Sequence, residues 1–201
     1  MFRSVSALGA MLSVIVATHE SERALVPTLS ALVPGAMSGL VTEVVVADAG
    51  SKDATAEVAD IAGCRFIAST APLGERLKAA ALSTRTPWLM FLRAGVVLDA
   101  DWMGASETFM QAAAFADTAP RAAVFRAAAT GSAQPGVGDV IALARAVLTG
   151  RRPSPDQGLV ICRSLYEAVG GHPAQADTEA KLLGQLGRKV ALLAAGARRV
   201  A

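Results

Sequence analysis

Residues 43–55 read EVVVADAGSKDAT, and this stretch decides the fold. Its first part, residues 43–47, is a short run rich in valine, which predicts a buried β-strand. Its second part, residues 48–53, is rich in turn-forming residues, and either Ser51 or Asp53 is suited to cap a following helix. The stretch therefore predicts a strand, a short turn and a helix in succession, which is the repeating unit of an α/β domain.

The same alternation continues on both sides of this stretch. Apolar runs predict further strands at residues 12–17, 65–68, 88–92, 122–126, 159–162 and 190–193. Helical patterns lie at residues 22–33, 74–83, 101–115, 137–148, 164–169 and 177–186, with Asp101 as the cap of the third of them. The run at 88–92 is apolar throughout and predicts a central strand. The sequence thus predicts an α/β domain with a mostly parallel central sheet flanked by helices.

Composition limits the class of protein. The chain has 201 residues, 53% apolar and 18% charged, which suits one folded domain with a substantial core. The net charge is +2 and aromatic residues make up 4%, without a basic block, so we expect no nucleic-acid partner. Cys64 and Cys162 are too few for a disulfide scaffold and match no metal-binding spacing, which favours a reducing compartment.

The first residues resemble a secretory signal only faintly. The apolar run at 5–17 is interrupted by Ser6, Gly9 and Ser13 and is too short to cross a bilayer, so it predicts a buried strand from residue 12. Met11 is a second candidate for the first residue of the protein. We expect no transmembrane segment and a location in the cytoplasm, or peripherally at the inner membrane face.

Polar residues follow three of the predicted strands, at 18–20, 48–53 and 93–95. In an open α/β sheet, ligands bind beyond the carboxyl ends of the strands. A helix that starts directly after residues 48–51 would offer free backbone N–H groups to an anion. The residues alone therefore predict a nucleotide or phosphate ligand, although the glycine-rich dinucleotide and P-loop patterns are absent.

Four segments carry a resemblance to a known family. Residues 13–20 (SVIVATHE), 43–55 and 88–92 (WLMFL) resemble, in order and spacing, the family 2 glycosyltransferases of the GT-A fold. Residues 156–171 (DQGLVICRSLYEAVGG) resemble a motif of one subgroup of small, soluble members. The resemblance extends from about Leu12 to Val200 and implies the GT-A, nucleotide-diphospho-sugar transferase fold. The expected organisation is an N-terminal extension at 1–10 and a single GT-A-like domain at 11–201, with a nucleotide-binding half at 11–101 and an acceptor-side half at 102–201.

The resemblance implies a site for a nucleotide-diphosphate sugar, a UDP- or GDP-sugar, with an unknown acceptor. By position, Thr18 and Glu20 would lie beside the base and ribose, and Asp48 beside the base. Gly50 and Ser51 belong to the same nucleotide-binding loop. A turn-ordering role is the alternative for Asp48, since an aspartate at a strand end often bonds its own turn.

The chain departs from the family pattern at the metal site. In the family, a D-A-D motif after the central strand holds Mg²⁺ or Mn²⁺ against the diphosphate, whereas this chain has Arg93, Ala94 and Gly95 there. These residues cannot ligate a hard cation, so no metal ligand and no cofactor are expected. Arg93 is either a surface arginine left where a ligand was lost, which we favour, or a fixed cation that replaces the metal beside the diphosphate. Residues 99–101 also match the pattern D-x-D, but they lie several residues beyond the end of the strand. Asp101 is better explained as a helix cap.

The chain departs again at the catalytic base. In the family an acidic pair before the last helix includes the base, and counting back from Gly187 places that pair at Gln175 and Ala176. Asp177 and Glu179 are the nearest carboxylates and are the candidate bases. His172 takes an aromatic position of the subgroup motif, which favours a structural role. His19 either touches the ligand or faces solvent.

These observations lead to two function hypotheses. The first is inverting, metal-independent transfer of a sugar to an acceptor hydroxyl, with Asp177 or Glu179 as base and Arg93, helped by Arg151 or Arg152, beside the diphosphate. The second is a catalytically degenerate GT-A scaffold, a pseudoenzyme, that acts as a nucleotide-binding or protein-interaction module. A purely structural protein without a ligand comes third.

Overall fold

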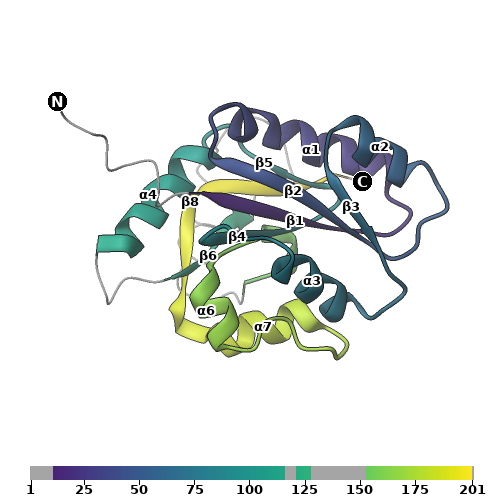
Figure 1. Ribbon diagram of the computed structural model, residues 1–201. Helices are drawn as coiled ribbons and strands as arrows, with labels where there is room; N and C mark the ends of the chain where they lie inside the picture. The colour runs from purple at the N-terminus through teal and green to yellow at the C-terminus, as the bar shows by residue number, and fades with distance from the viewer. Residues whose placement is uncertain (1–10, 116–120, 128–152, 201) are drawn as a thin grey trace, which may run out of the picture.

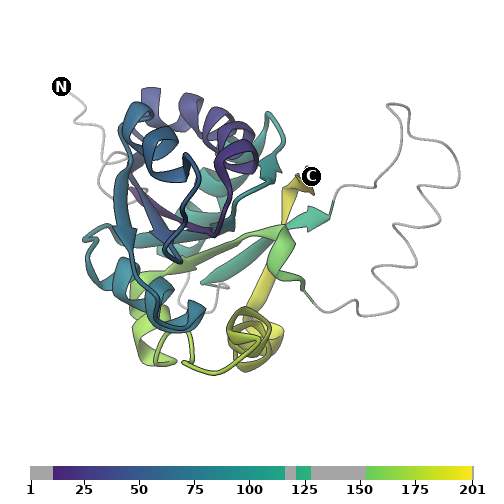
Figure 2. The same cartoon turned by 90° about the vertical axis from the view of Figure 1, so that its right-hand side faces the viewer.

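The computed structural model describes residues 11–115, 121–127 and 153–200, and these residues form one mixed sheet with helices on both faces (Figures 1 and 2). The strands are β1 (Leu12–Thr18), β2 (Val41–Asp48), β3 (Arg65–Ala68), β4 (Trp88–Arg93), β5 (Val96–Leu98), β6 (Ala122–Ala127), β7 (Leu159–Cys162) and β8 (Val190–Arg199). The helices are α1 (Glu22–Met37), α2 (Thr55–Ile61), α3 (Leu73–Leu82), α4 (Trp102–Phe115), α6 (Arg163–Ala168) and α7 (Thr178–Leu186). Two 3-10 turns, η1 (Pro155–Gln157) and η2 (Gly187–Lys189), complete the described elements.

The sheet has the strand order β3-β2-β1-β4-β7-β6-β8-β5. Its first half is parallel, because β1 pairs with β2 and β4, and β2 pairs with β3, all in the same direction. In the other half β6 and β8 are parallel, whereas β7 runs antiparallel to β4 and β6, and β5 runs antiparallel to β8. Among the described strands, four of the seven pairings are thus parallel, and the predicted α/β class is confirmed.

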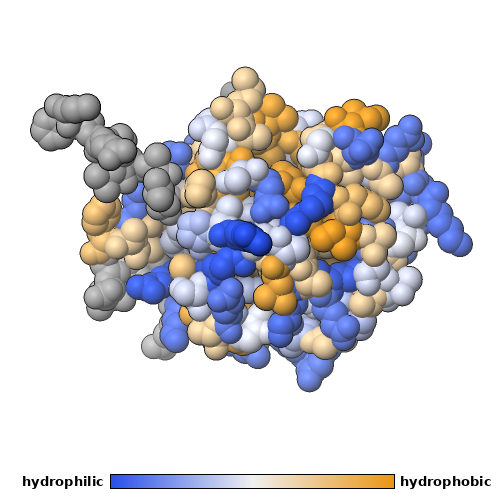
Figure 3. Space-filling view, in the orientation of Figure 1, coloured by the Kyte–Doolittle hydropathy of each residue, from blue (hydrophilic) through white to orange (hydrophobic). Residues whose placement is uncertain are grey.

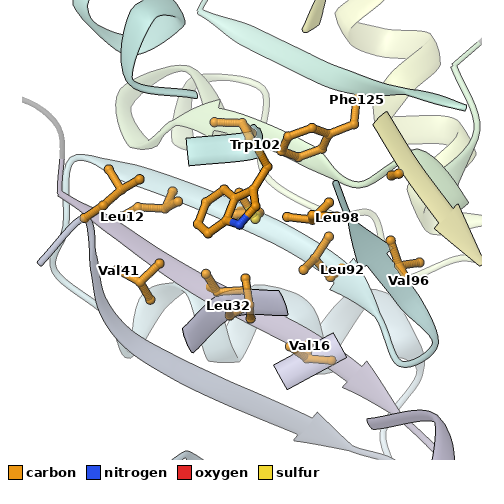
Figure 4. Packing of buried hydrophobic residues seen from close by; sticks show 14 of the residues in the cluster. Leu12, Val16, Leu32, Val41, Leu92, Val96, Leu98, Trp102 and Phe125 are labelled. Carbon is orange, nitrogen blue, oxygen red and sulfur yellow. The ribbon is translucent and has the colours of Figure 1, made fainter. Parts of the chain in front are cut away.

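The hydrophobic core has two parts, one on each face of the sheet. Alternation along β1 sends Val14 and Val16 to the face covered by α1, α2 and α4, and sends Ile15 to the face covered by α3, α6 and α7. In Figure 4 the indole of Trp102 lies between Leu32 of α1 and Phe125 of β6. Trp102 is 1% exposed, and its indole N–H donates to the carbonyl of Ala31 over 3.0 Å.

Gly35 of α1 makes this packing possible. A Cβ atom at this position would lie 2.6 Å from the Trp102 ring, well inside van der Waals contact. The absence of a side chain therefore lets the indole pack directly against the helix backbone.

Most predicted elements are confirmed within a few residues, and three differ. The first helix continues to Met37 through both Pro27 and Pro34, where the prediction ended it at residue 33. The last strand, β8, runs to Arg199 instead of residue 193, and β5 was not predicted. Residues 194–199 contain no β-branched residue, so their strand conformation comes from pairing with β5 and β6 rather than from local preference. The helix predicted at 137–148, the extension at 1–10, Arg151 and Arg152 lie outside the described residues.

The surface is apolar over α1 and α2. Figure 3 shows apolar side chains gathered at the top of this face, above a more hydrophilic lower part. Among the exposed apolar residues of these helices are Val26, Val33, Met37 and Ile61. None of the described helices has the length and apolar character that crossing a membrane requires.

Candidate functional site

Three polar strand ends meet at the carboxyl edge of the parallel half of the sheet. Thr18 at the end of β1 is opposite Asp48 at the end of β2, and Ala17 is opposite Arg93 at the end of β4. The sequence predicted these positions to be neighbours, and the sheet register places them on adjacent strands. The β1–α1 loop begins after Thr18, and the β2–α2 loop begins after Asp48.

Asp48 is fully buried, and its carboxylate accepts four hydrogen bonds from its surroundings. The Thr18 hydroxyl donates at 2.7 Å, the Gly50 amide at 2.7 Å, and both the amide and the hydroxyl of Ser51 at 2.6 Å. Burial raises the pKa of Asp48, but these hydrogen bonds together lower it by more than burial raises it. The pKa of Asp48 therefore lies below its ordinary value. The geometry corresponds to the alternative in which Asp48 orders its own turn.

Glu20 connects the same network to the neighbouring loop. Its amide donates to the Ser51 hydroxyl at 2.8 Å, and its carboxylate accepts from the Lys52 amide at 2.8 Å. Glu20 has a φ of 46°, in the left-handed region that non-glycine residues seldom adopt. All five predicted nucleotide-binding residues thus lie in one connected group: Thr18, Glu20, Asp48, Gly50 and Ser51.

Reciprocal hydrogen bonds join the β1–α1 loop to the β2–α2 loop a second time. The Glu22 amide donates to Asp53 at 3.0 Å, and the Ala54 amide donates to Glu22 at 3.1 Å. Asp53 also accepts from the Thr55 amide at 3.1 Å. The N-cap of α2 is Ala54, without a side-chain cap bond, so neither Ser51 nor Asp53 is the N-cap that the sequence suggested.

Most of the backbone amides between β2 and α2 have partners within the chain. The N–H groups of residues 50, 51, 52, 54 and 55 all donate to carboxylates of this chain. Of these residues only Thr55 belongs to α2. The loop amides before the helix are therefore paired within the chain, and the anion site expected at the helix start itself stays a prediction.

Arg93 and Glu179 form an ion pair across the carboxyl edge. The Arg93 Nε donates to Glu179 Oε2 at 2.8 Å, and its Nη2 makes a second contact with the same oxygen. Glu179 lies in the first turn of α7, and its side chain is 10% exposed against 35% for Arg93. The hydrogen bond with Glu179 raises the pKa of Arg93, although burial acts in the opposite direction. Two of the three predicted catalytic residues are therefore in direct contact.

Two further charged residues extend the pair. Asp156 Oδ1, from η1, lies 3.9 Å from Arg93 Nη1 and 2.7 Å from Nη1 of Arg199, which is the last residue of β8. The sequence analysis missed Arg199, because it ended the last strand at residue 193. We call these four residues the charged cluster: Arg93, Asp156, Glu179 and Arg199.

Asp177, the third predicted catalytic residue, precedes α7 as its N-cap. Its backbone is left-handed, with a φ of 57°, and its side chain is exposed without bonding the helix amides. It therefore presents a carboxylate to solvent within two residues of Glu179.

A small cavity of about 10 Å³ lies beside Glu179, with Phe91, Gly158, His172 and Leu183 among its walls. A space of this size suits about one water molecule and not a sugar. Two larger grooves, of about 640 Å³ and about 430 Å³, flank α1, and neither has Asp48 or Arg93 among its lining residues.

His172 forms part of the wall of this cavity and is 3% exposed. Its Nδ1 lies 2.9 Å from the Tyr166 hydroxyl, and its ring packs edge-on against Phe91 at 4.6 Å. Burial lowers the pKa of His172 to about 3, which keeps the imidazole neutral near pH 7. The geometry matches the structural role that the sequence favoured.

Arg76 is a site residue to which the sequence analysis assigned no role. From α3, its guanidinium donates to the carbonyl of Ala47 at 2.6 Å and to that of Thr18 at 3.4 Å, at the ends of β2 and β1. Arg76 precedes the buried Ala80 by four residues, so both lie on the helix face toward the sheet. That spacing is the signal that could have identified it.

The residues present do not fit a divalent metal. Where the family has aspartates, Arg93 places a guanidinium, and the two nearest carboxylates of the charged cluster are paired to arginines. Within the described ranges, no group of three or more histidine, cysteine, aspartate or glutamate side chains is arranged to hold a metal ion.

Comparisons with known proteins bear on the fold. No protein-family model and no curated protein sequence matches the chain. Solved structures do match: Staphylococcus aureus TarS 1–349 has 17% identity and a TM-score of 0.64, over 94% of this chain and 60% of that one. Glucosyl-3-phosphoglycerate synthase from Mycobacterium tuberculosis, in complex with Mn²⁺, UDP and phosphoglyceric acid, has 19% identity and a TM-score of 0.63, over 92% and 68%.

A third match is the mannosyltransferase PcManGT from Pyrobaculum calidifontis, in complex with GDP-Man and Mn²⁺. It has 15% identity and a TM-score of 0.66, over 90% of this chain and 55% of that one. The chain thus spans about 60% of the length of the first matched structure. Together with the mixed sheet and its flanking helices, these matches show that the chain has the GT-A glycosyltransferase fold.

Proposed function

We propose that this protein binds a UDP- or GDP-sugar at the carboxyl edge of β1, β2 and β4, and transfers the sugar to an acceptor hydroxyl without a metal. The observation that carries the proposal is the Arg93–Glu179 pair. It places a fixed cation at the end of the central strand and an acidic side chain of the last helix beside it. In the matched structures, UDP, UDP-GlcNAc and GDP-Man are the bound nucleotides.

The transfer step is a single displacement with inversion. The base takes the proton of the acceptor hydroxyl, whose oxygen attacks the anomeric carbon. The bond from that carbon to the diphosphate oxygen breaks, and the nucleoside diphosphate leaves. Arg93 stabilises the negative charge that develops on the leaving group, since a guanidinium suits phosphate oxygens.

Asp177 is the better base of the two candidates. The side chain of Glu179 is 10% exposed and its Oε2 is paired with Arg93, which makes it less accessible to an acceptor hydroxyl. The Asp177 carboxylate is exposed and lies on the same helix start. This assignment makes Asp177 the catalytic residue and Glu179 the partner of Arg93 in the free protein.

The second candidate function is a nucleotide-binding or interaction module without transfer. The observation that favours it is the internal pairing of the site, in which the amides of Lys52 and Ala54 and the guanidinium of Arg93 have partners within the chain. For either function we propose a location in the cytoplasm or at the inner face of the membrane.

A thermal-shift titration with UDP, GDP and their sugars, in EDTA and then with Mn²⁺, tests the proposal. A ligand that binds the native state raises the melting temperature as its concentration increases. We expect the ligand to raise the melting temperature in EDTA, and by the same amount when Mn²⁺ is added. The shift should be lost in Arg93→Ala and retained in Arg198→Ala. A shift that requires Mn²⁺ would contradict metal independence. If no nucleotide raises the melting temperature, only an interaction module remains. If a nucleotide binds but no product forms in an acceptor screen, the second candidate function is favoured.

A further inference from the structure

The charged cluster brings together four side chains from four elements. Arg93 comes from the end of β4, Asp156 from η1, Glu179 from α7 and Arg199 from the end of β8. Its formal charge is zero, because two guanidinium groups face two carboxylates. Asp156 is the shared member, with one oxygen 2.7 Å from Arg199 and 3.9 Å from Arg93.

The cluster is open to solvent on one side. The side chains of Asp156 and Arg199 are 43% and 53% exposed, whereas Glu179 is 10% exposed. A ligand can therefore reach the Asp156 side of the cluster directly. The Glu179 side is buried, where an arginine without a partner would be costly.

Carboxylate and phosphate present the same acceptors to a guanidinium. Both offer paired oxygens to the planar fork of N–H donors, and both form charge-assisted hydrogen bonds with it. An oxygen at the place of Asp156 Oδ1 lies within reach of both arginines. The carboxylates thus occupy places that phosphoryl oxygens would suit.

We infer that Arg93 and Arg199 are a binding pair for a diphosphate, and that Asp156 and Glu179 fill this site in the free protein and yield it when the ligand binds. The inference rests on the proposed function for the identity of the ligand. It adds Arg199 as a second cation, and it adds Asp156 and Glu179 as internal competitors for the two arginines. Binding proceeds by exchange: the diphosphate takes the place of Asp156 first, because that carboxylate is the exposed one.

Exchange predicts effects of opposite sign within one cluster. Removing an arginine weakens diphosphate binding, whereas neutralising a carboxylate strengthens it, because the competitor for the same donors is lost. Asp156→Asn keeps the backbone amide that donates to the Ser154 hydroxyl, so the η1 turn is retained. A network that served only to hold the fold would change melting temperatures without affecting anion binding.

Isothermal titration of the full chain with inorganic pyrophosphate, in EDTA and at low salt, measures this directly. We expect Arg93→Ala and Arg199→Ala each to weaken binding at least about tenfold, and Asp156→Asn and Glu179→Gln each to strengthen it about threefold or more. Arg198→Ala is the matched control: this neighbour on β8 lines a groove beside α1 and should bind as the wild type does. Orthophosphate should bind more weakly than pyrophosphate, because it spans the two arginines less well.

The outcomes separate this inference from the proposed function. If nucleotides bind while Asp156→Asn and Glu179→Gln leave pyrophosphate affinity unchanged, or if Arg199→Ala behaves like Arg198→Ala, the exchange is refuted and the proposed function remains. If no nucleotide binds but the two carboxylate variants gain pyrophosphate affinity, the exchange holds and the proposed function fails. Melting curves of each variant show whether it is folded, and an unfolded variant is replaced by Arg93→Lys or Arg199→Lys.

Discussion

The hydroxyl of Thr18 donates to the carboxylate of Asp48 over 2.7 Å, and this bond ties the end of β1 to the end of β2. Both side chains are buried, at 3% and 0% exposure. A buried carboxylate needs partners for its charge, and Asp48 obtains them from its own turn and from this hydroxyl. The edge of the sheet where a ligand is proposed is thus organised around an internal anion.

Replacing Asp48 by Asn should destabilise the protein. The amide keeps one acceptor but places an NH₂ group against donors of Gly50 and Ser51, so at least one buried hydrogen bond is lost. We expect the free energy of unfolding to fall by about 2 kcal/mol, measured by urea denaturation. Asp60→Asn, on the exposed side of α2, is the control and should change it by less than about 0.5 kcal/mol. Equal effects of the two substitutions would mean that the turn does not depend on this charge.

His172 should make stability depend on pH in the mildly acidic range. Its folded pKa of about 3 lies below the ordinary value of 6.5, so between these two values the unfolded chain binds a proton that the folded chain does not. The free energy of unfolding should therefore decrease as pH falls from 6.5, by up to about 1.4 kcal/mol per pH unit. Melting curves at about pH 7 and about pH 5 measure this loss.

Substituting His172 by Phe should flatten that dependence, because the position then carries no titrating group. The exposed His19 provides the control, and His19→Gln should retain the wild-type slope. A slope that survives in His172→Phe would assign the pH dependence to other groups. Asp48, with its lowered pKa, loses its contribution only as pH falls below about 4, outside this window.

Gly158 should not tolerate a side chain. Its φ is 69°, and a Cβ atom would lie 2.7 Å from the Leu92 side chain. We expect Gly158→Ala to lower the free energy of unfolding by about 2 kcal/mol, through backbone strain and overpacking. Gly184→Ala, in α7 with open space around it, should be neutral or stabilising by up to about 1 kcal/mol. A neutral Gly158→Ala would show that the turn between η1 and β7 can rearrange.

Asp177 and Glu179 should differ in their effect on transfer. If a nucleotide sugar and acceptor are found, Asp177→Asn should lower kcat at least about a hundredfold, because the base is lost. Glu179→Gln should retain most of kcat, because Glu179 does not take the acceptor proton. Rates measured with saturating donor distinguish the two, and a larger loss in Glu179→Gln would reverse the assignment of the base.

The parallel half of the fold could be predicted because its signals are local. The run at 43–47 is apolar and rich in valine, and the turn at 48–53 follows it directly, so the strand and its exit needed no tertiary information. The strand at 88–92 was equally clear, and its central position in the sheet follows from its apolar character. The meeting of Thr18, Asp48 and Arg93 at one edge then follows from parallel pairing.

The remainder could not be predicted, because it depends on pairing and on side-chain choice. The end of β8 consists of small residues and arginines, whose strand conformation comes from β5 and β6, so Arg199 and its contact with Asp156 were missed. Counting back from Gly187 identified Glu179 as a candidate base but could not show that it forms an ion pair with Arg93. The pairing of the loop amides before α2 was missed for the same reason, since Glu20 and Glu22 accept from the amides of Lys52 and Ala54 from another loop.

The reciprocal bonds between the β1–α1 and β2–α2 loops have a consequence for amide hydrogen exchange. The Glu20 amide depends on Ser51, and the Lys52 and Ala54 amides depend on Glu20 and Glu22, so neither loop can open alone without exposing donors in the other. The two loops should therefore exchange as one cooperative unit, with similar protection on both sides. The protection of the Lys52 amide then reports the state of a loop thirty-two residues earlier in the chain.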